Sequence, residues 1–274
     1  MATFRASTFN VQDGNISRNI HVRWYELPIS ALTIRRLSRT NGQLDLPGVN
    51  ASFFHAGIMS SIHWFNGRAV HTGGDTNLTD GPVNTSTSMS CMFHTSQGVS
   101  LRPRAVNIND LLVAPSSINW AIGGFSLFLN ETHNGLQSMI SRYASFYSGM
   151  AIDTWVPALR GRRARTFIAA NPSQNRLCIG VMSTNIDISS SGVISDDFQN
   201  SNLSTGHGAT YFDMHSILRN NLNCNIGMAI DGGGSTRLRR ISRITGNSPI
   251  QYTAQRDPNR NVLCQLSFLG AQPN

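Results

Sequence analysis

The stretch of residues 210–236 constrains the fold of this chain more than any other part of the sequence. Apolar residues recur there at helical spacing as far as Leu222, and residues 226–230 are apolar without a break. Thr210 and Asp213, three positions apart, form a capping-box-like helix start. We therefore predict a helix from Thr210 to Leu222, followed by a short buried strand at 226–230.

The end of the predicted strand places a single acid beside a glycine-rich turn. Asp231 is followed directly by Gly232, Gly233 and Gly234. Three consecutive glycines lose much backbone entropy on folding, so they indicate a positive φ or a ligand that closely approaches the main chain. A plain tight turn, closed by an Asx-type hydrogen bond from Asp231, is the alternative interpretation.

Arginine supplies all the basic residues of the chain. There are 22 of them against 14 acids, and the formal net charge is +8. The absence of lysine excludes a P-loop lysine, a Schiff-base lysine and a Ser-Lys dyad. Arginine binds phosphate bidentately, so the composition suits a phosphate-bearing partner. A compositional habit of the source, or selection against lysine modification, is the simpler explanation.

Metal and cofactor chemistry has little support in the sequence. The four cysteines form no CxxC pair, and we expect buried free thiols. His55, His63 and His71 have no evident carboxylate partner, so we predict no cofactor and leave a divalent cation open. The start of the chain lacks the apolar core of a signal peptide, and no apolar run is long enough to span a bilayer. We therefore expect a soluble protein of the cytoplasm or host cytoplasm, without a membrane partner.

The remaining patterns predict a mixture of strands and helices. Residues 20–27 alternate as a strand does, and residues 30–42 have the spacing and caps of a short helix. No linker, charge block or repeat divides the chain. The predicted fold class is α+β, a single domain over residues 1–274 of twisted mixed β-sheets with a few packed helices. Further expected elements are a polar loop at 72–88, a buried strand at 120–129, a helix from 136 to about 149, a strand hairpin before and after the turn at 171–172, a surface loop at 186–207, and strands at 237–244 and 262–269.

Four segments, taken together and in order, resemble a known family. They are VNASFF at 49–54, WAIGGFSLFL at 120–129, RRARTFIA at 162–169, and GATYFDMHSIL followed by AIDGGGST within 208–236. They are similar to motifs of the phosphodiester glycosidases, and the resemblance spans about residues 28–270. Residues 51, 125 and 164 depart from the family's usual Gly, Gly and Pro. No serine-hydrolase, zinc-protease, P-loop or dinucleotide-binding motif is present.

The resemblance implies cleavage of a sugar from a sugar-1-phosphodiester. Asp231 would act as nucleophile or base, Arg165 would stabilise the departing phosphate, and Asn50 would complete the catalytic group. A phosphate monoester leaves as a stable anion, so charge stabilisation matters more here than a strong general acid. The implied partner is a small sugar phosphodiester or a nucleotide-sugar-like ligand. The residues expected to bind it are Gly123, Gly124, Arg162, Thr166, His207, Gly232, Gly233, Gly234, Ser235 and Thr236.

Two other function classes fit the same sequence. A divergent protein with this pocket would hold a phosphorylated sugar or nucleotide-derived ligand without cleaving it. The arginine excess taken alone suggests a polyanion-binding structural protein, whose nucleic-acid binding would depend steeply on salt. We expect nucleic acid not to be a partner. Retention or inversion at the anomeric carbon stays open, because it depends on the spacing of carboxylates.

Overall fold

The computed structural model describes residues 1–37, 44–51, 54–55, 58–59, 61–70, 89–105, 107–147, 161–187, 192–195, 207–241, 249–254, 262 and 264–269. Across these residues the protein is mostly β-structure, and its α-helices are two short ones. The predicted α+β fold class is therefore wrong. The physical reason is that most apolar segments pair edge to edge into two large sheets, and these sheets supply most of the buried core.

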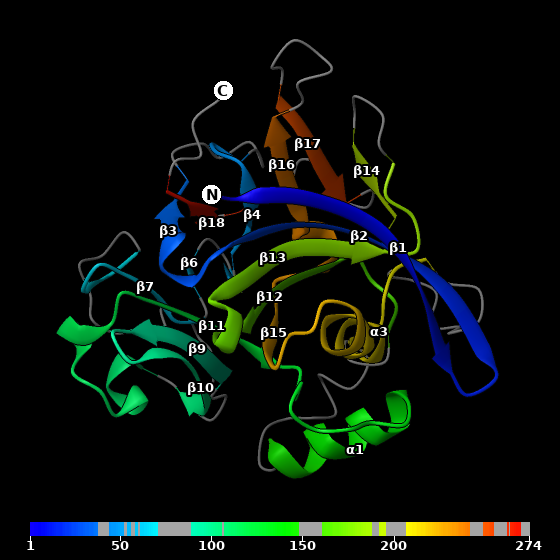
Figure 1. Cartoon of the computed structure of the whole chain (residues 1–274), viewed down its shortest axis with the longest axis horizontal. Coiled ribbons are helices and arrows are strands. Elements are labelled where there is room, and N and C mark those ends of the chain that lie inside the picture. The colour runs from blue at the N-terminus through cyan, green and yellow to red at the C-terminus, as the bar shows by residue number, and fades with distance from the viewer. Residues whose placement is uncertain are drawn as a thin grey trace.

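The larger sheet has ten strands and crosses the middle of the molecule (Figure 1). All its pairings are antiparallel, as in the neighbouring pairs formed by residues 165–171 with 176–183 and with 226–230. Its strands, in spatial order, are β1 (Thr3–Asp13), β2 (Ile16–Pro28), β13 (Arg176–Ser183), β12 (Arg165–Asn171), β15 (Ile226–Ile230), β11 (Trp120–Ser126), β7 (His63–Phe65) and β8 (Arg68–Ala69), with β9 (Met89–Thr95) on β11 and β10 (Gly98–Ala105) on β9.

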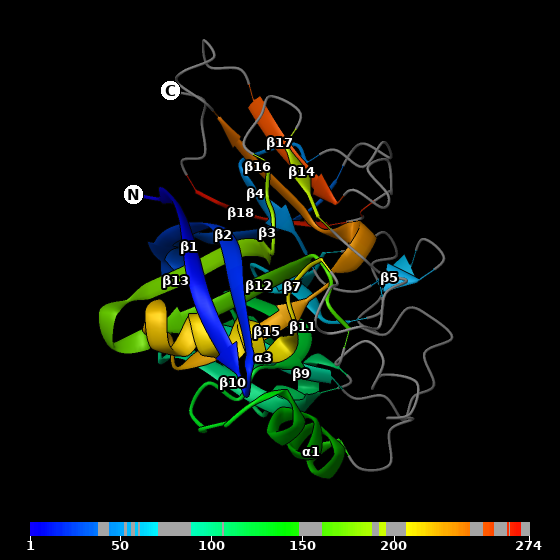
Figure 2. The ribbon, with the colours of Figure 1, turned by 90° about the vertical axis from the view of Figure 1, so that its right-hand side faces the viewer.

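A six-stranded sheet packs against one face of this sheet, and the helices lie on the other side. Figures 1 and 2 show this layering from two directions. The only parallel pairing among the described strands joins β14 to β17. The six strands, in spatial order, are β14 (Val193–Ile194), β17 (Pro249–Ala254), β16 (Arg237–Ile241), β4 (Gly48–Asn50), β18 (Cys264–Phe268) and β3 (Leu32–Arg36); β5 (Phe54–His55) and β6 (Ile58–Met59) form a separate pair.

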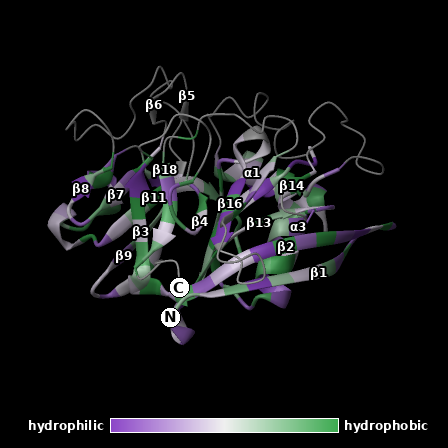
Figure 3. Cartoon of the chain, turned by 90° about the horizontal axis from the view of Figure 1, so that it is seen from above, coloured by the Kyte–Doolittle hydropathy of each residue, from purple (hydrophilic) through white to green (hydrophobic). Residues whose placement is uncertain are grey.

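Two hydrophobic clusters cover the two faces of the ten-stranded sheet. One cluster fills the space toward the six-stranded sheet, and the other includes the helices. Successive side chains of a strand point to opposite faces. Trp24 and Tyr25 of β2 accordingly belong to different clusters, as do Phe167 and Ile168 of β12. Figure 3 shows hydrophobic and hydrophilic residues alternating along the β1–β2 hairpin.

The helices are α1 (Leu136–Phe146) and α3 (Tyr211–Ser216), and α3 continues as a π-helical turn over Ile217–Asn221. The predicted capping box at the start of α3 is confirmed. Thr210 Oγ1 accepts a hydrogen bond from the Asp213 backbone N–H at 3.1 Å, and the Asp213 carboxylate accepts one from the Thr210 N–H at 2.8 Å. Short 3-10 turns occur at Ile29–Ala31, Ile108–Leu111, Pro115–Ser117, Pro172–Gln174 and Gly233–Ser235.

The helix predicted at residues 30–42 is not formed over the part that the structure describes. A 3-10 turn at Ile29–Ala31 leads into β3, in which Leu32 and Ile34 are buried and alternate with more exposed residues. Ala31, Ile34 and Leu37 also recur at a spacing of three, which is why the sequence favoured a helix. The strand forms because pairing of β3 with β18 satisfies the backbone hydrogen-bonding groups of β3 and buries every second side chain.

Most other predicted elements that fall on described residues are confirmed. Strands occupy 120–126, 165–171, 176–183, 226–230 and 264–268, and a helix occupies 136–146. The strand expected at 20–27 is longer and covers Ile16–Pro28. Several predictions lie outside the described residues: the loop at 72–88, His71, most of the loop at 186–207, and the ends of the segments expected at 30–42 and 237–244.

Candidate functional site

Asp231 and Arg165 come from neighbouring strands. β12 pairs antiparallel with β15, and Thr166 lies opposite Ile230. Arg165 is the first residue of β12, while Asp231 follows the last residue of β15. One step along this ladder therefore brings the two charged residues side by side, on strands that are roughly 5 Å apart. Arg165 is buried, and Asp231 is half-buried.

The glycine-rich turn after Asp231 is hydrogen-bonded to the residue that precedes β12. The Gly233 N–H donates to the Ala164 carbonyl at 2.7 Å, and a Cβ on Gly232 would lie 3.0 Å from the same oxygen. Gly233 has a φ of 58°, a conformation that glycine adopts at no steric cost. Close approach to β12 and a left-handed residue thus explain two of the glycines, and Gly234 follows within the same 3-10 turn.

Asn50 joins the two large sheets at this point. Its Nδ2 donates to the Asp231 carbonyl at 2.7 Å and to the Ala51 carbonyl at 3.2 Å. Its Oδ1 accepts from Thr166 Oγ1 at 2.9 Å and from the Arg237 N–H at 2.8 Å. Asn50 is 1% exposed. These four hydrogen bonds fix the main chain at Asp231 and the side chain of Thr166. The predicted catalytic role of Asn50 stays a prediction.

The guanidinium of Arg165 is oriented by main-chain and ring contacts. Nε donates to the Ala209 carbonyl at 2.9 Å, and Nη2 donates to the Gly161 carbonyl at 2.6 Å. Cζ lies 4.6 Å from the centroid of the Tyr211 ring. Burial raises the pKa of Tyr211, the nearby cations Arg165 and Arg163 lower it, and the Asp231 carboxylate raises it. The cation, the phenol and the carboxylate therefore act on one another across one small region.

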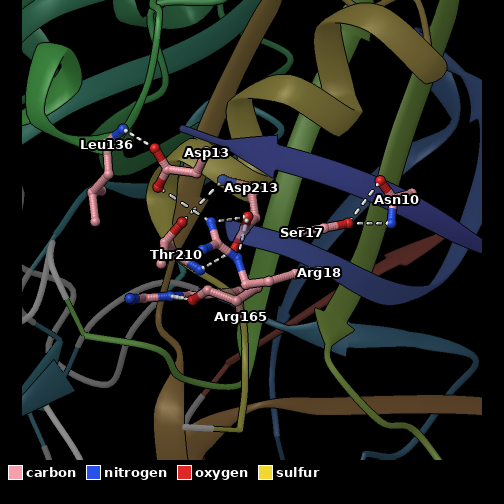
Figure 4. A network of polar contacts seen from close by, with 9 residues as sticks. Asn10, Asp13, Ser17, Arg18, Leu136, Arg165, Thr210 and Asp213 are labelled. Carbon is pink, nitrogen blue, oxygen red and sulfur yellow. Dashed lines mark hydrogen bonds and ion pairs between the residues drawn. The ribbon is translucent and has the colours of Figure 1, made fainter. Parts of the chain in front are cut away.

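A buried ion pair fixes the start of α3, beside Arg165 (Figure 4). Arg18 of β2 donates to Asp213 Oδ1 through Nε at 3.1 Å and through Nη2 at 2.7 Å, and Nη2 also lies 3.3 Å from Asp13 Oδ2. The Asp213 side chain is 0% exposed and that of Arg18 is 3% exposed. The sequence identified Asp213 as a capping residue but missed Arg18, because the two positions are 195 residues apart.

Three further residues of the predicted site are buried near these groups. The Ser235 and Thr236 hydroxyl oxygens are buried and have no hydrogen-bond partner within the described chain. Buried hydroxyls are normally hydrogen-bonded, so each of these two calls for a polar partner that the described residues do not supply. Their predicted contact with substrate stays a prediction. Arg162 is buried beside the ion pair: burial lowers its pKa, Arg18 lowers it further, and Asp213 raises it.

The other predicted residues have different surroundings. A Cβ on Gly123 would lie 2.8 Å from Ser61 Cβ, and one on Gly124 would lie 2.6 Å from the Ala229 carbonyl oxygen. Close packing of the chain around β11 thus accounts for both glycines. His207 is exposed and has none of the hydrogen bonds that join the other residues. Their predicted contacts with substrate stay predictions.

Metal-binding groups are not assembled in the described residues. Within them, no cluster of three or more His, Cys, Asp or Glu side chains could hold a metal ion. His63 Nδ1 lies 2.8 Å from the Ser61 carbonyl oxygen, which occupies one of its ring nitrogens. All four cysteines are buried and free, as expected. No helix in the described chain is long and apolar enough to cross a membrane.

A cavity of about 560 Å³ lies at the opposite end of β15 from Asp231. Its walls include Ile226 and Gly227 at the start of β15, together with Phe128 and the Glu131–Arg142 ion pair. The cavity is thus separate from the region around Asp231, and none of the residues predicted for the site lines it.

Comparison with known proteins shows that the fold of this chain is similar to that of a solved catalytic domain. No protein-family model and no curated protein matches the chain in sequence. The chain is similar to the catalytic domain of zebrafish N-acetylglucosamine-1-phosphodiester alpha-N-acetylglucosaminidase, solved in a form auto-inhibited by its pro-peptide, with a TM-score of 0.62 and 11% identity over 97% of this chain and 83% of that one. A hypothetical protein from Synechocystis matches with a TM-score of 0.48 and 12% identity, over 96% of this chain and 62% of that one. The chain therefore shares the fold of the zebrafish catalytic domain.

Proposed function

We propose that this chain is a hydrolase that releases a sugar from a sugar-1-phosphodiester, with Asp231 and Arg165 at its active centre. The observation that carries the proposal is the strand register that brings Asp231 beside Arg165. The fold shared with a phosphodiester glycosidase catalytic domain supports it. The four family-like sequence segments support it further, because three of them supply Asn50, Arg165 and Asp231.

Asp231 is suited to act at the anomeric carbon. Its main chain is fixed by the 2.7 Å hydrogen bond from Asn50, and the turn behind it is fixed by the hydrogen bond from Gly233 to Ala164. The residue itself is half-buried, so substrate can reach it from solvent. A carboxylate in such a place stabilises an oxocarbenium-like transition state as nucleophile or as base.

Arg165 is suited to stabilise the phosphate as it departs. Two of its nitrogens are bound to carbonyls and its plane lies over Tyr211, so the cation is held in one orientation before substrate arrives. Preorganised charge of this kind is worth more than mobile charge, because nothing has to reorient during the reaction. The Ser235 and Thr236 hydroxyls supply further donors for sugar or phosphate oxygens.

Replacement of the carboxylate tests the proposal. Asp231→Asn keeps the size and the main-chain contacts of the residue, and it should reduce sugar release from a panel of sugar-1-phosphodiesters by about 10²–10⁴-fold. Mass spectrometry follows the free sugar. The matched control is Asp45→Asn, which removes a carboxylate that lies 3.6 Å from the exposed guanidinium of Arg35. The assignment is wrong if Asp231→Asn turns over within a few fold of the parent.

Arg165→Lys is the second arm of the same experiment. Lysine keeps the charge but cannot make both carbonyl contacts with one planar group over the Tyr211 ring, so turnover should fall. Arg68→Lys, at an exposed position of β8, serves as the control. If the parent protein binds members of the panel and never releases sugar from them, the chain is a binding protein and the hydrolase proposal fails.

A further inference from the structure

A second arginine cluster lies between the two large sheets. Arg23 and Tyr25 are two residues apart in β2, so both side chains are on the face that meets the six-stranded sheet. Arg240 of β16 and Tyr252 of β17 approach them from that sheet. Between β2 and β15, which leads into Asp231, stand β13 and β12. The cluster is therefore three strand spacings from β15, roughly 14 Å along the sheet.

Contacts between the sheets fix the geometry of this cluster. The Tyr25 hydroxyl donates to the Arg239 carbonyl at 3.0 Å. The Arg240 guanidinium lies over two rings, 4.9 Å from the centroid of Phe4 and 5.8 Å from that of Tyr252. Phe4 is opposite Tyr25 in the β1–β2 pairing, and their rings meet edge to face at 5.3 Å. Among the described residues, Arg240 is thus held in place by aromatic rings and not by an acid.

Within the part of the chain that the structure describes, no acidic side chain balances the positive charge of this cluster. Among the described residues, no carboxylate forms an ion pair with Arg23 or Arg240. Arg23 is 8% exposed, and its Nη1 donates to the Val22 carbonyl at 2.9 Å. Burial lowers the pKa of Arg23, Tyr252 raises it, and Arg240 lowers it. One buried and one half-buried cation therefore repel each other, which costs free energy unless an anion joins them.

Polar atoms without a partner point to the same conclusion. Arg240 Nε and the Tyr252 hydroxyl are buried and have no hydrogen-bond partner in the described chain. Tyr252 as a whole is 0% exposed. Buried donors of this kind are rare in folded proteins, and each one calls for an explanation. An anion next to both arginines would accept hydrogen bonds from these atoms.

We propose that Arg23, Arg240 and Tyr252 form a binding site for one tetrahedral oxyanion, a phosphate, a sulfate or the phosphate group of an ester. Guanidinium groups present paired N–H donors that match the oxygens of such an anion. A dianion balances two arginines, and the phenol adds a neutral donor. The site binds independently of Asp231 and Arg165, and its role is to hold an anionic group between the two sheets.

The test is anion binding measured by calorimetry and by thermal unfolding at constant ionic strength, with inorganic phosphate and sulfate against chloride. Arg240→Gln should weaken phosphate binding at least about tenfold, which corresponds to one lost charge-assisted hydrogen bond. Tyr252→Phe removes only a hydroxyl that has no partner among the described residues, so it should fold like the parent and still bind phosphate more weakly. Arg5→Gln, on the adjacent β1 and largely exposed, is the control that should change nothing.

Two results would overturn the proposal. In one, the parent shows no difference between phosphate, sulfate and chloride. In the other, phosphate stabilises the parent, Arg240→Gln and Tyr252→Phe equally, while Arg165→Gln abolishes the effect, which assigns the bound anion to the Asp231 region instead. A phosphate monoester measured beside inorganic phosphate identifies the natural class: tighter binding of the ester supports an esterified ligand, and equal binding supports a free oxyanion.

Discussion

Asn50→Ala is the substitution whose consequences follow most fully from the structure. The change removes the amide that bonds Asp231, Thr166 and the Arg237 main chain. The Arg237 N–H and the Asp231 carbonyl would each lose this partner, at about 1–3 kcal/mol for each buried group left unsatisfied. The Thr166 hydroxyl can rotate and loses less. We therefore expect the free energy of unfolding to fall by about 3–5 kcal/mol, a large share of the roughly 5–15 kcal/mol available to a domain.

Urea denaturation and thermal unfolding measure this loss. At about 2 °C for each kcal/mol in a chain of this length, the melting temperature of Asn50→Ala should fall by about 6–10 °C. Thr166→Val is the matched control, because it removes one hydrogen bond and keeps the shape of the side chain. Its cost should be about 1 kcal/mol, since Asn50 Oδ1 still accepts from the Arg237 N–H. If Asn50→Ala is no less stable than Thr166→Val, Asn50 does not tie the two sheets together.

Two further predictions concern buried charge. Asp213→Asn should lower the free energy of unfolding by about 3–5 kcal/mol, measured in urea, because the buried Arg18 guanidinium loses its shortest carboxylate contacts and keeps only Asp13, at 3.3 Å. A loss under about 1 kcal/mol would contradict this prediction. The pKa of His215 is lowered: burial lowers it, the hydrogen bond to the Leu127 carbonyl partly offsets this, and His133 lowers it further. In the unfolded chain His215 has its ordinary pKa of about 6.5, so below that pH the unfolded chain binds more protons than the folded one. The free energy of unfolding should therefore fall as the pH drops through about 6.5. Thermal unfolding at about pH 5–8 should show a weaker pH dependence for His215→Gln. An unchanged slope in the variant would remove His215 as its source.

The sequence predicted well those parts of the fold that depend on local pattern. The apolar run at 226–230 and the turn signals after it indicated β15 and the glycine-rich turn, because a short buried strand needs little context to be identified. That Asp231 and Arg165 act in one site was predicted only from the resemblance of the sequence motifs to those of a known family. No local signal for it exists, since strand pairing between distant segments created it.

What the sequence could not predict depends on contacts between distant residues. Residues 30–42 satisfy both helical and strand spacing, and the pairing of β3 with β18 decided between them. No sequence pattern predicted that Arg18 forms a buried ion pair, because its partner Asp213 lies on a helix far along the chain. The overall balance of strand over helix was missed for the same reason: sheet formation is a property of many segments at once.

The proposed hydrolase activity requires Asp231 and Arg165 to contact the same substrate molecule. The most direct measurement is a crystal structure of Asp231→Asn soaked with an intact sugar-1-phosphodiester that the parent protein cleaves. We predict that the phosphate lies against Arg165, with the anomeric carbon next to the side chain of residue 231. A ligand bound instead in the cavity beside Arg142, with its phosphate away from Arg165, would contradict the account.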